Sequence, residues 1–258
     1  MKLYLKYLLV VSITGLLFGC TSSKPNFENV PEKELFTKAQ QELENGNIRT
    51  SIAVLEEMDK SFPFGPYSQQ VQLDLIYAYY KSNDYPITIA SIDRFIKLNP
   101  TNSNIDWVIY LRGLSNMAQD DNQIQSWFNV NRSDRDYSFA VAAFKDFNYL
   151  IASYPNSPYS YDAEKRLVAL KNRLANYQLK VAQYYDERGA YVAVVNRVTK
   201  MLEDYSDTDA TRRGINLMKN AYVELGLFEE ASKAELLYQA NIDQVSSTDE
   251  DKDFLWVF

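Results

Sequence analysis

A recurring turn at regular spacing constrains the fold of this 258-residue chain more than any other feature. In each occurrence a small or turn-forming residue precedes an apolar one, at Gly46-Asn47-Ile48, Asn83-Asp84-Tyr85, Gly189-Ala190-Tyr191 and Gly226-Leu227-Phe228. Ile48 and Tyr85 lie 37 positions apart, and so do Tyr191 and Phe228. Equal spacing in two distant parts of the chain indicates a structural repeat, so its units should stack on one another.

Breaks of a second kind alternate with these turns. They lie at Phe62-Pro63, Leu98-Asn99-Pro100, Tyr154-Pro155-Asn156-Ser157 and Tyr205-Ser206-Asp207-Thr208. Between the breaks, apolar residues recur three and four positions apart, as expected for helices, and alternating strand patterns are scarce. The spacing is close to the roughly 34-residue period of tetratricopeptide repeats. We therefore expect an all-α fold, a right-handed superhelical solenoid of about five tetratricopeptide-like helix pairs.

The third pair is expected to be irregular. A helix from about Ile105 to Met117 should pair with one from about Tyr137 to Tyr154. The polar segment between them, about 118–136, is interpreted as an insertion loop on the surface. Trp127 and Phe128 within it either cap the core or provide an exposed contact.

The N-terminus resembles an export signal. Lys2 and Lys6 precede a short apolar run that ends in Gly19 and Cys20, the only cysteine of the chain. Leu17-Phe18-Gly19-Cys20 resembles the lipobox of bacterial lipoproteins, which implies a diacylglycerol and an N-acyl chain on Cys20. Residues 1–19 are then a lipoprotein signal peptide and 20–31 a flexible lipidated tether. The alternative is an ordinary secretory signal with a coincidental cysteine.

Composition argues against several function classes. With 27 basic and 34 acidic side chains, the chain carries a formal charge of −7, which disfavours nucleic acid as a partner. It contains no histidine, the commonest general base and metal ligand. Adjacent acids such as Glu56-Glu57 and Asp120-Asp121 are expected to be solvated. We therefore expect no catalytic residues, no metal and no cofactor, and a binding protein in place of an enzyme.

The segment from Gln69 to Tyr80 is apolar on two faces. One stripe contains Leu73, Ile76, Tyr77 and Tyr80, and the other contains Gln72, Leu75 and Tyr79. A helix that is apolar on two sides is expected to lie between two neighbours, with most of its tyrosines in the core.

Several blocks together resemble one family. They are Phe62 to Lys81, Ile92 to Ile96, Asn99-Pro100, Tyr110 to Leu114, Arg132 to Asp136, Tyr154 to Ser157, Lys165 to Leu167 and Glu187 to Val198. The chain is similar, from the lipobox to about Tyr222, to the BamD (ComL) family, lipoproteins of the outer-membrane β-barrel assembly machinery.

The resemblance implies how the chain is organised and what it binds. Residues 32–157 would form N-terminal units with a groove for unfolded barrel precursors, and 158–243 C-terminal units that dock the POTRA region of BamA. BamC and BamE would be further partners, on the periplasmic face of the outer membrane. A rival function is a tetratricopeptide lipoprotein that serves as a scaffold for peptidoglycan or cell-division enzymes.

Candidate contact residues follow from the two surfaces. Phe64, Tyr67, Gln70 and Asp74 are predicted to line the inlet of the precursor groove, because they offer aromatic faces and side-chain amides after the break at Pro63. The resemblance implies a BamA interface at Arg188, Asn196 and Arg197. Arg197 has a second interpretation, an internal ion pair with an acid such as Asp204 or Glu187.

The C-terminal tail, 244–258, has no counterpart in the family and is expected to be flexible. Phe254, Trp256 and Phe258 alternate as in a strand, which resembles the closing strand of a barrel precursor. The tail could therefore occupy the precursor groove, or pack against the last helix pair.

Overall fold

A computed structural model describes residues 27, 30–120 and 137–241. Within these ranges every regular element is an α-helix. The helices are α2 (Glu32–Glu44), α3 (Ile48–Ser61), α4 (Ser68–Lys81), α5 (Tyr85–Leu98), α6 (Ile105–Asp120), α8 (Ser138–Ser153), α9 (Ser160–Asp186), α10 (Tyr191–Asp204), α11 (Asp209–Glu224) and α12 (Phe228–Asn241). Cys20, Trp127, Phe128 and the predicted tail lie outside the described residues.

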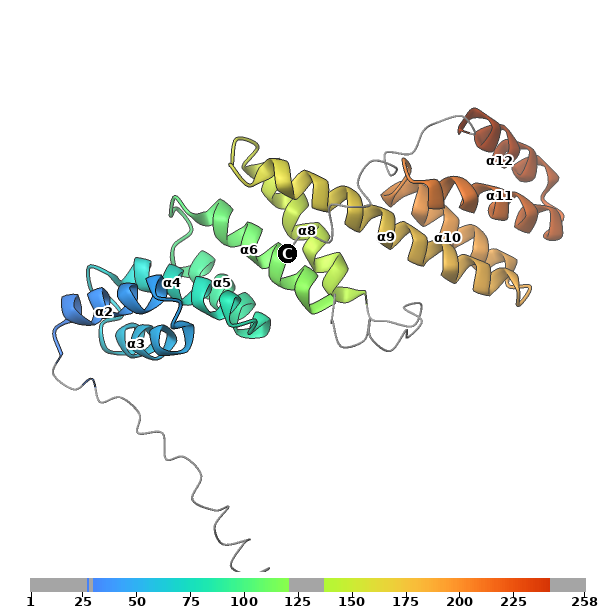
Figure 1. The fold of residues 1–258 in the computed structure, drawn as a ribbon. Helices are drawn as coiled ribbons and strands as arrows, with labels where there is room; N and C mark the ends of the chain where they lie inside the picture. The colour runs from blue at the N-terminus through green and yellow to red at the C-terminus, as the bar shows by residue number, and fades with distance from the viewer. Residues whose placement is uncertain (1–26, 28–29, 121–136, 242–258) are drawn as a thin grey trace, which may run out of the picture.

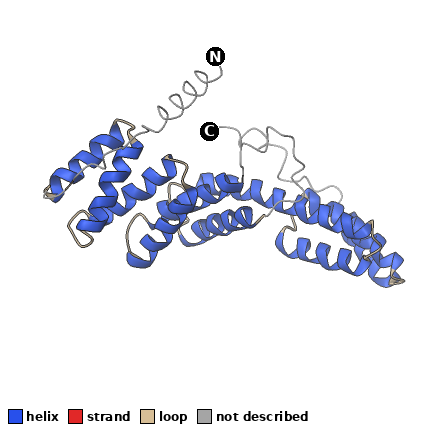
Figure 2. Ribbon diagram, turned by 90° about the horizontal axis from the view of Figure 1, so that it is seen from below, coloured by secondary structure: helices blue, strands red, loops and turns tan. Residues whose placement is uncertain are grey.

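The helices are arranged as five consecutive pairs, α2/α3, α4/α5, α6/α8, α9/α10 and α11/α12. Each helix packs against the next in the described chain, so the pairs form an elongated row from α2 to α12 (Figure 1). Seen from below, the row is curved like an arch (Figure 2). This arrangement confirms the predicted all-helical solenoid.

The four predicted turns share one backbone conformation. Gly46, Asn83, Gly189 and Gly226 are the four residues with positive φ in the described part of the chain, at 62° to 74°. At each turn the next residue donates its N–H to a carbonyl five positions back, as Leu227 does to Tyr222 at 2.9 Å. This pattern is the Schellman motif, which ends a helix with a left-handed residue. Asn83 takes the place of glycine in the second pair because asparagine tolerates that region.

The second helices end in a shared way as well. Phe62, Asn99, Tyr154 and Tyr205 follow α3, α5, α8 and α10 with φ between −129° and −141° and ψ between 38° and 58°. The carbonyl of each accepts a hydrogen bond from the N–H three residues on. Phe62, Asn99 and Tyr154 each come directly before a proline. A residue before a proline disfavours helical geometry, so each helix ends there.

The core consists of two clusters that meet at α4. Leu75 packs with α2 and α3 in the smaller N-terminal cluster, whereas Leu73 and Ile76 belong to the larger cluster that continues to α12. The prediction that α4 lies between two neighbours is therefore confirmed. Tyr77 differs from the expectation: its side chain is 41% exposed, because it lies between the two buried stripes.

Helix α9 is longer than the repeat predicts. It runs for 27 residues without interruption and packs against α8 as well as α10 and α11. Because α9 packs against α8 of the preceding pair as well as against its own partner α10, the core continues across the predicted division at 157/158. Helix α6 also continues to Asp120, three residues into the segment expected to be a loop.

A polar network joins the middle helices. Arg112 on α6 donates to Asp146 on α8 at 2.7 and 2.9 Å and to Asp93 on α5 at 2.6 Å. Asn116 donates to the second carboxylate oxygen of Asp146 at 2.9 Å, and both residues are buried. Charged hydrogen bonds of this kind fix the relative positions of the three helices.

A second network anchors the start of α9. Tyr110 on α6 donates its hydroxyl to Asp162 at 2.5 Å and stacks on Tyr159, with ring centroids 5.0 Å apart. Arg166, which is buried, also donates to Asp162. Burial, together with the hydrogen bond to Asp162, raises the pKa of Tyr110 to about 12.

Candidate polypeptide-binding site

The loop between α3 and α4 presents one aromatic side chain to solvent. Phe62 packs against the N-terminal core, and its carbonyl accepts the N–H of Gly65 at 3.1 Å. A side chain at Gly65 would collide with the carboxylate of Glu32, so the loop lies close against the start of α2. Phe64 lies between two prolines and is 97% exposed. A large apolar side chain held out on a restrained loop is suited to anchor a partner.

Tyr67 is half-buried and contacts α2. Its ring stacks on that of Phe36, with centroids 4.5 Å apart and an interplanar angle of 15°. Tyr67 therefore fixes α4 against α2, and one of its faces is not available to a peptide.

Gln70 and Asp74 form a hydrogen-bonded group with Gln40 of α2. Gln70 donates to one carboxylate oxygen of Asp74 at 2.8 Å, and Gln40 donates to the other at 2.5 Å. Burial raises the pKa of Asp74, while the two amide hydrogen bonds act in the opposite direction. Asp74 thus orients the exposed amide of Gln70.

The structure adds Tyr77 to this face of α4. Tyr77 follows Gln70 by seven residues and Asp74 by three, so the three lie along one side of the helix. The seven-residue spacing was visible in the sequence, but the apolar character of tyrosine placed Tyr77 in the core stripe. The exposed set is therefore Phe64, Gln70 and Tyr77, with Tyr67 and Asp74 supporting it from the side of α2.

Two further amide pairs hold the other flank of α4. Gln72 accepts a hydrogen bond from Asn99 at 3.1 Å, and Gln69 accepts one from Asn102 at 3.0 Å. The loop after α5 is thereby tied to α4. These pairs could not be predicted from the sequence, because glutamines spaced along a helix give no indication of their partners.

The second candidate surface begins at the end of α9. Arg188 is exposed, and its guanidinium lies 4.4 Å from the ring centroid of Tyr184, a cation–π contact. Tyr184 is itself half-exposed. The left-handed Gly189 then turns the chain into α10.

On α10, Asn196 lies one turn after Val192, and both are exposed. Arg197 lies on a different flank and donates to the side-chain carbonyl of Gln178 on α9 at 2.9 Å. The alternative interpretation of Arg197, an internal ion pair with an acid such as Asp204 or Glu187, is wrong. Arg197 has no carboxylate partner among the described residues, and Asp204 pairs with Lys200 at 3.1 Å. An amide partner leaves the positive charge of Arg197 unneutralised.

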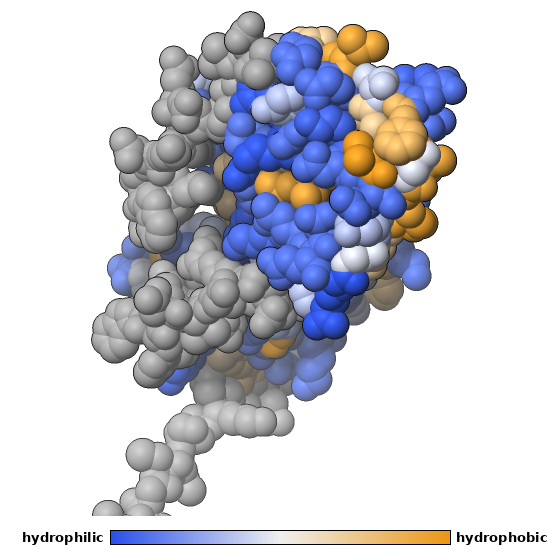
Figure 3. All heavy atoms as spheres, turned by 90° about the vertical axis from the view of Figure 1, so that its right-hand side faces the viewer, coloured by the Kyte–Doolittle hydropathy of each residue, from blue (hydrophilic) through white to orange (hydrophobic). Residues whose placement is uncertain are grey.

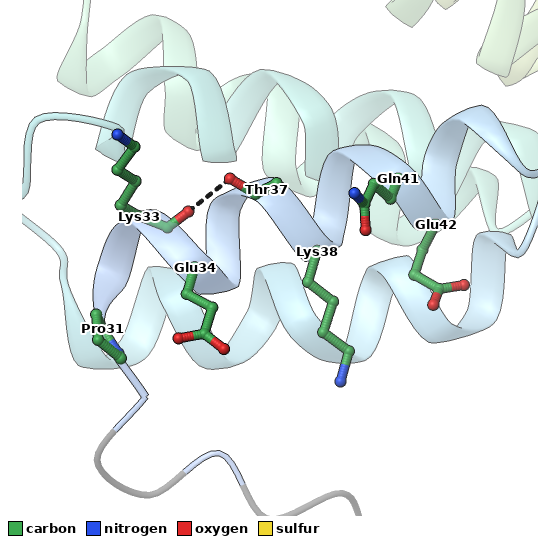
Figure 4. A pocket seen from close by; sticks show the side chains of 7 residues that line it. All are labelled: Pro31, Lys33, Glu34, Thr37, Lys38, Gln41 and Glu42. Carbon is green, nitrogen blue, oxygen red and sulfur yellow. Dashed lines mark hydrogen bonds between the residues drawn. The ribbon is translucent and has the colours of Figure 1, made fainter.

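A shallow pocket lies on the outer face of α2 (Figure 4). All of its lining comes from α2 and the residue before it, and every lining residue except the first carries a polar or charged group: Pro31, Lys33, Glu34, Thr37, Lys38, Gln41 and Glu42. Thr37 donates its hydroxyl to the carbonyl of Lys33 at 2.9 Å. One helix face with alternating charges presents no converging groups for a small molecule.

Two kinds of feature are absent from the described ranges. Within 30–120 and 137–241, no three acidic, cysteine or histidine side chains come together as metal ligands would. In those ranges no helix combines the length and the apolar character that crossing a bilayer requires.

Comparison with known proteins identifies the family. A family described as outer membrane lipoprotein (YfiO) matches residues 28–237. The chain belongs to this family. Three similar relatives are each named outer membrane protein assembly factor BamD. The one from Vibrio cholerae is 47% identical and aligns over 88% of this chain and 94% of its own length. The relative from Pasteurella multocida is 40% identical and aligns over 92% of this chain and 91% of its own length. The relative from Haemophilus influenzae is 37% identical and aligns over 93% of this chain and 92% of its own length. The predicted resemblance to the BamD family is thus confirmed.

Proposed function

We propose that this chain is a non-enzymatic subunit of the outer-membrane protein assembly machinery, which binds unfolded barrel precursors and docks BamA. Membership of the BamD family and alignment over nearly the full length of its relatives support this role. A row of stacked helix pairs offers long surfaces suited to other polypeptides.

The exposed ring of Phe64 is the observation that carries the precursor-binding part of the proposal. Unfolded barrel strands alternate apolar and polar residues. Phe64 and Tyr77 offer apolar contacts, and Gln70 offers an amide to a peptide backbone. Because Asp74 and Tyr67 are themselves fixed by α2, the surface is largely preformed.

Binding of a C-terminal barrel peptide to the full chain tests this part. Phe64→Ala should weaken binding by roughly tenfold, since a well-placed aromatic anchor contributes about 1.4 kcal/mol or more. Tyr67→Phe should bind like the wild type, because the stack on Phe36 remains. Phe139→Ala, which removes a 37% exposed ring from α8, is the matched control. Unchanged affinity in Phe64→Ala rejects the assignment of this site.

Docking of BamA is assigned to the surface that contains Arg188, Asn196 and Arg197. An exposed arginine beside an aromatic ring and an arginine without a carboxylate partner are both suited to meet acidic groups of another protein. Arg197→Glu should abolish co-purification of BamA, whereas Arg197→Gln should reduce it. Retention of BamA by the Arg197→Glu protein, with helicity intact, would defeat this interface.

Anchoring through acyl chains on Cys20 completes the proposal, with the solenoid on the periplasmic face and BamC and BamE as companions. Two or more acyl chains give a far stronger anchor than a single chain. Cys20→Ala should move the protein from the membrane fraction to the soluble periplasmic fraction. Membrane retention of this variant in the absence of BamA would contradict lipid anchoring.

A further inference from the structure

The last helix of the solenoid has an apolar side without a partner among the described residues. α12 buries Ala231 and Ala234 against α11. On other sides of the same helix, Leu236 is 71% exposed and Phe228 is 67% exposed. Leu236 lies two residues after Ala234, on the face directed away from the core.

Other exposed apolar residues gather around the same end. They lie at the end of α11, in the turn after it and on α12: Val223, Leu225, Leu227 and Leu237. Figure 3, which looks onto this end of the molecule, shows separate hydrophobic patches on a surface that is otherwise mainly hydrophilic. Exposed apolar side chains that gather at one end of a solenoid are typical of a surface that another segment or protein covers.

The opposite end of the row differs. The outer face of α2 carries Lys33, Glu34, Lys38 and Gln41 and is polar, as a terminal solenoid unit needs to be (Figure 4). α2 therefore ends the row with a polar face, whereas α12 ends it with exposed apolar side chains.

We propose that residues 254–258 of this chain, Phe-Leu-Trp-Val-Phe, cover the outer face of α12. Helix α12 ends at Asn241, so twelve residues separate it from Phe254. At about 3.3 Å per residue they reach about 40 Å, and α12 is only about 21 Å long. The segment therefore reaches any point on this helix.

The dimensions of the segment suit the face. Phe228 and Leu236 are separated by about 12 Å along the helix axis. An extended segment from Phe254 to Phe258 spans about 13 Å, with Phe254, Trp256 and Phe258 on one side. Covalent attachment also gives the segment a millimolar effective concentration, which favours it over a second copy of the chain as the occupant.

Photo-crosslinking in the full chain tests the proposal. A photoreactive amino acid in place of Trp256 should crosslink within the same chain to α12, as peptide mass spectrometry would show. The same amino acid in place of Ser247 is the positional control and should give little of this product. Leu236→Glu should abolish the crosslink, whereas Leu98→Glu, at a 57% exposed leucine on α5, should preserve it.

Three results would overturn the proposal. Crosslinks from position 256 to the loop around Phe64 would place the segment in the precursor site. Crosslinks between two chains, seen as dimers on a denaturing gel, would make a second copy the occupant. The absence of any crosslink would leave the face open to another protein. Because Leu236 is exposed, Leu236→Glu should retain its helicity by circular dichroism. The crosslink to α12 does not depend on whether the chain binds precursors.

Discussion

Gly214 inside α11 and Gly226 just after its end should respond in opposite ways to substitution by alanine. Gly226 ends α11 with φ of 73°, and a side chain there would meet no atom within 4 Å. Gly214 lies inside α11, where a side chain would meet Val198 and Met201 at 3.4 to 3.5 Å, an ordinary contact distance. Any effect at Gly226 is therefore conformational, and any effect at Gly214 combines helix propensity with mild packing.

The magnitudes follow from these conformations. An alanine in the left-handed region costs about 1–2 kcal/mol, partly offset by about 0.4–1 kcal/mol from the lower entropy of the unfolded chain. Gly226→Ala should thus destabilise by about 1 kcal/mol. Gly214→Ala should stabilise by up to about 1 kcal/mol, because alanine is the better helix former. The two variants should differ by about 2 kcal/mol in free energy of unfolding.

Urea denaturation followed by far-UV circular dichroism measures the difference. With a slope of about 2 kcal/mol per molar, the midpoints of the two variants should lie about 1 M apart. Gly226→Asn should fall between Gly226→Ala and the wild type, since Asn83 occupies the same conformation in the second pair. Equal shifts in the same direction for both alanine variants would refute the assignment of the turn.

Three further predictions concern the middle of the solenoid. Gly113→Ala should destabilise by about 1–3 kcal/mol in thermal denaturation, because the new methyl would lie 2.6 Å from the fully buried ring of Phe147; an unchanged melting temperature would contradict this. Asp146→Ala should cost about 3 kcal/mol in urea denaturation, since it leaves Arg112 with one carboxylate and buried Asn116 with none, and a loss below about 1 kcal/mol would contradict the network. Tyr110 has a folded pKa of about 12, above its ordinary value of 10.0, so its stabilising contribution is complete below pH 10 and is lost as the pH rises towards 12. Tyr110→Phe should therefore remove one phenolate that titrates near pH 12 in ultraviolet absorbance, and removal of one that titrates near pH 10 would contradict the assignment.

The turns were the most predictable part of the fold. Gly46, Asn83, Gly189 and Gly226 could be read from the sequence because few residues tolerate the left-handed region, so the backbone requirement selects the residue type. The aromatic or asparagine that ends each second helix was readable for a similar reason, since proline or a polar turn follows it.

Helix α9 and the contact residues were harder to predict. Nothing between Ser160 and Asp186 breaks a helix, but the sequence pattern does not show that this one helix packs against both α8 and α11. Tyr77 has the apolar ring typical of a core residue, yet it is exposed. Arg197 donates a hydrogen bond to the side-chain amide of Gln178 on another helix. Such positions depend on tertiary neighbours, which hydrophobic periodicity does not specify.

Co-purification of the full chain in mild detergent tests the central claim, that this solenoid works by holding other polypeptides for outer-membrane assembly. The proposed function predicts that a large β-barrel protein with POTRA domains is recovered at near-equal amounts, and that it is lost from the Arg197→Glu variant. Recovery of a peptidoglycan synthase or hydrolase in its place, unaffected by Arg197→Glu, would contradict the account.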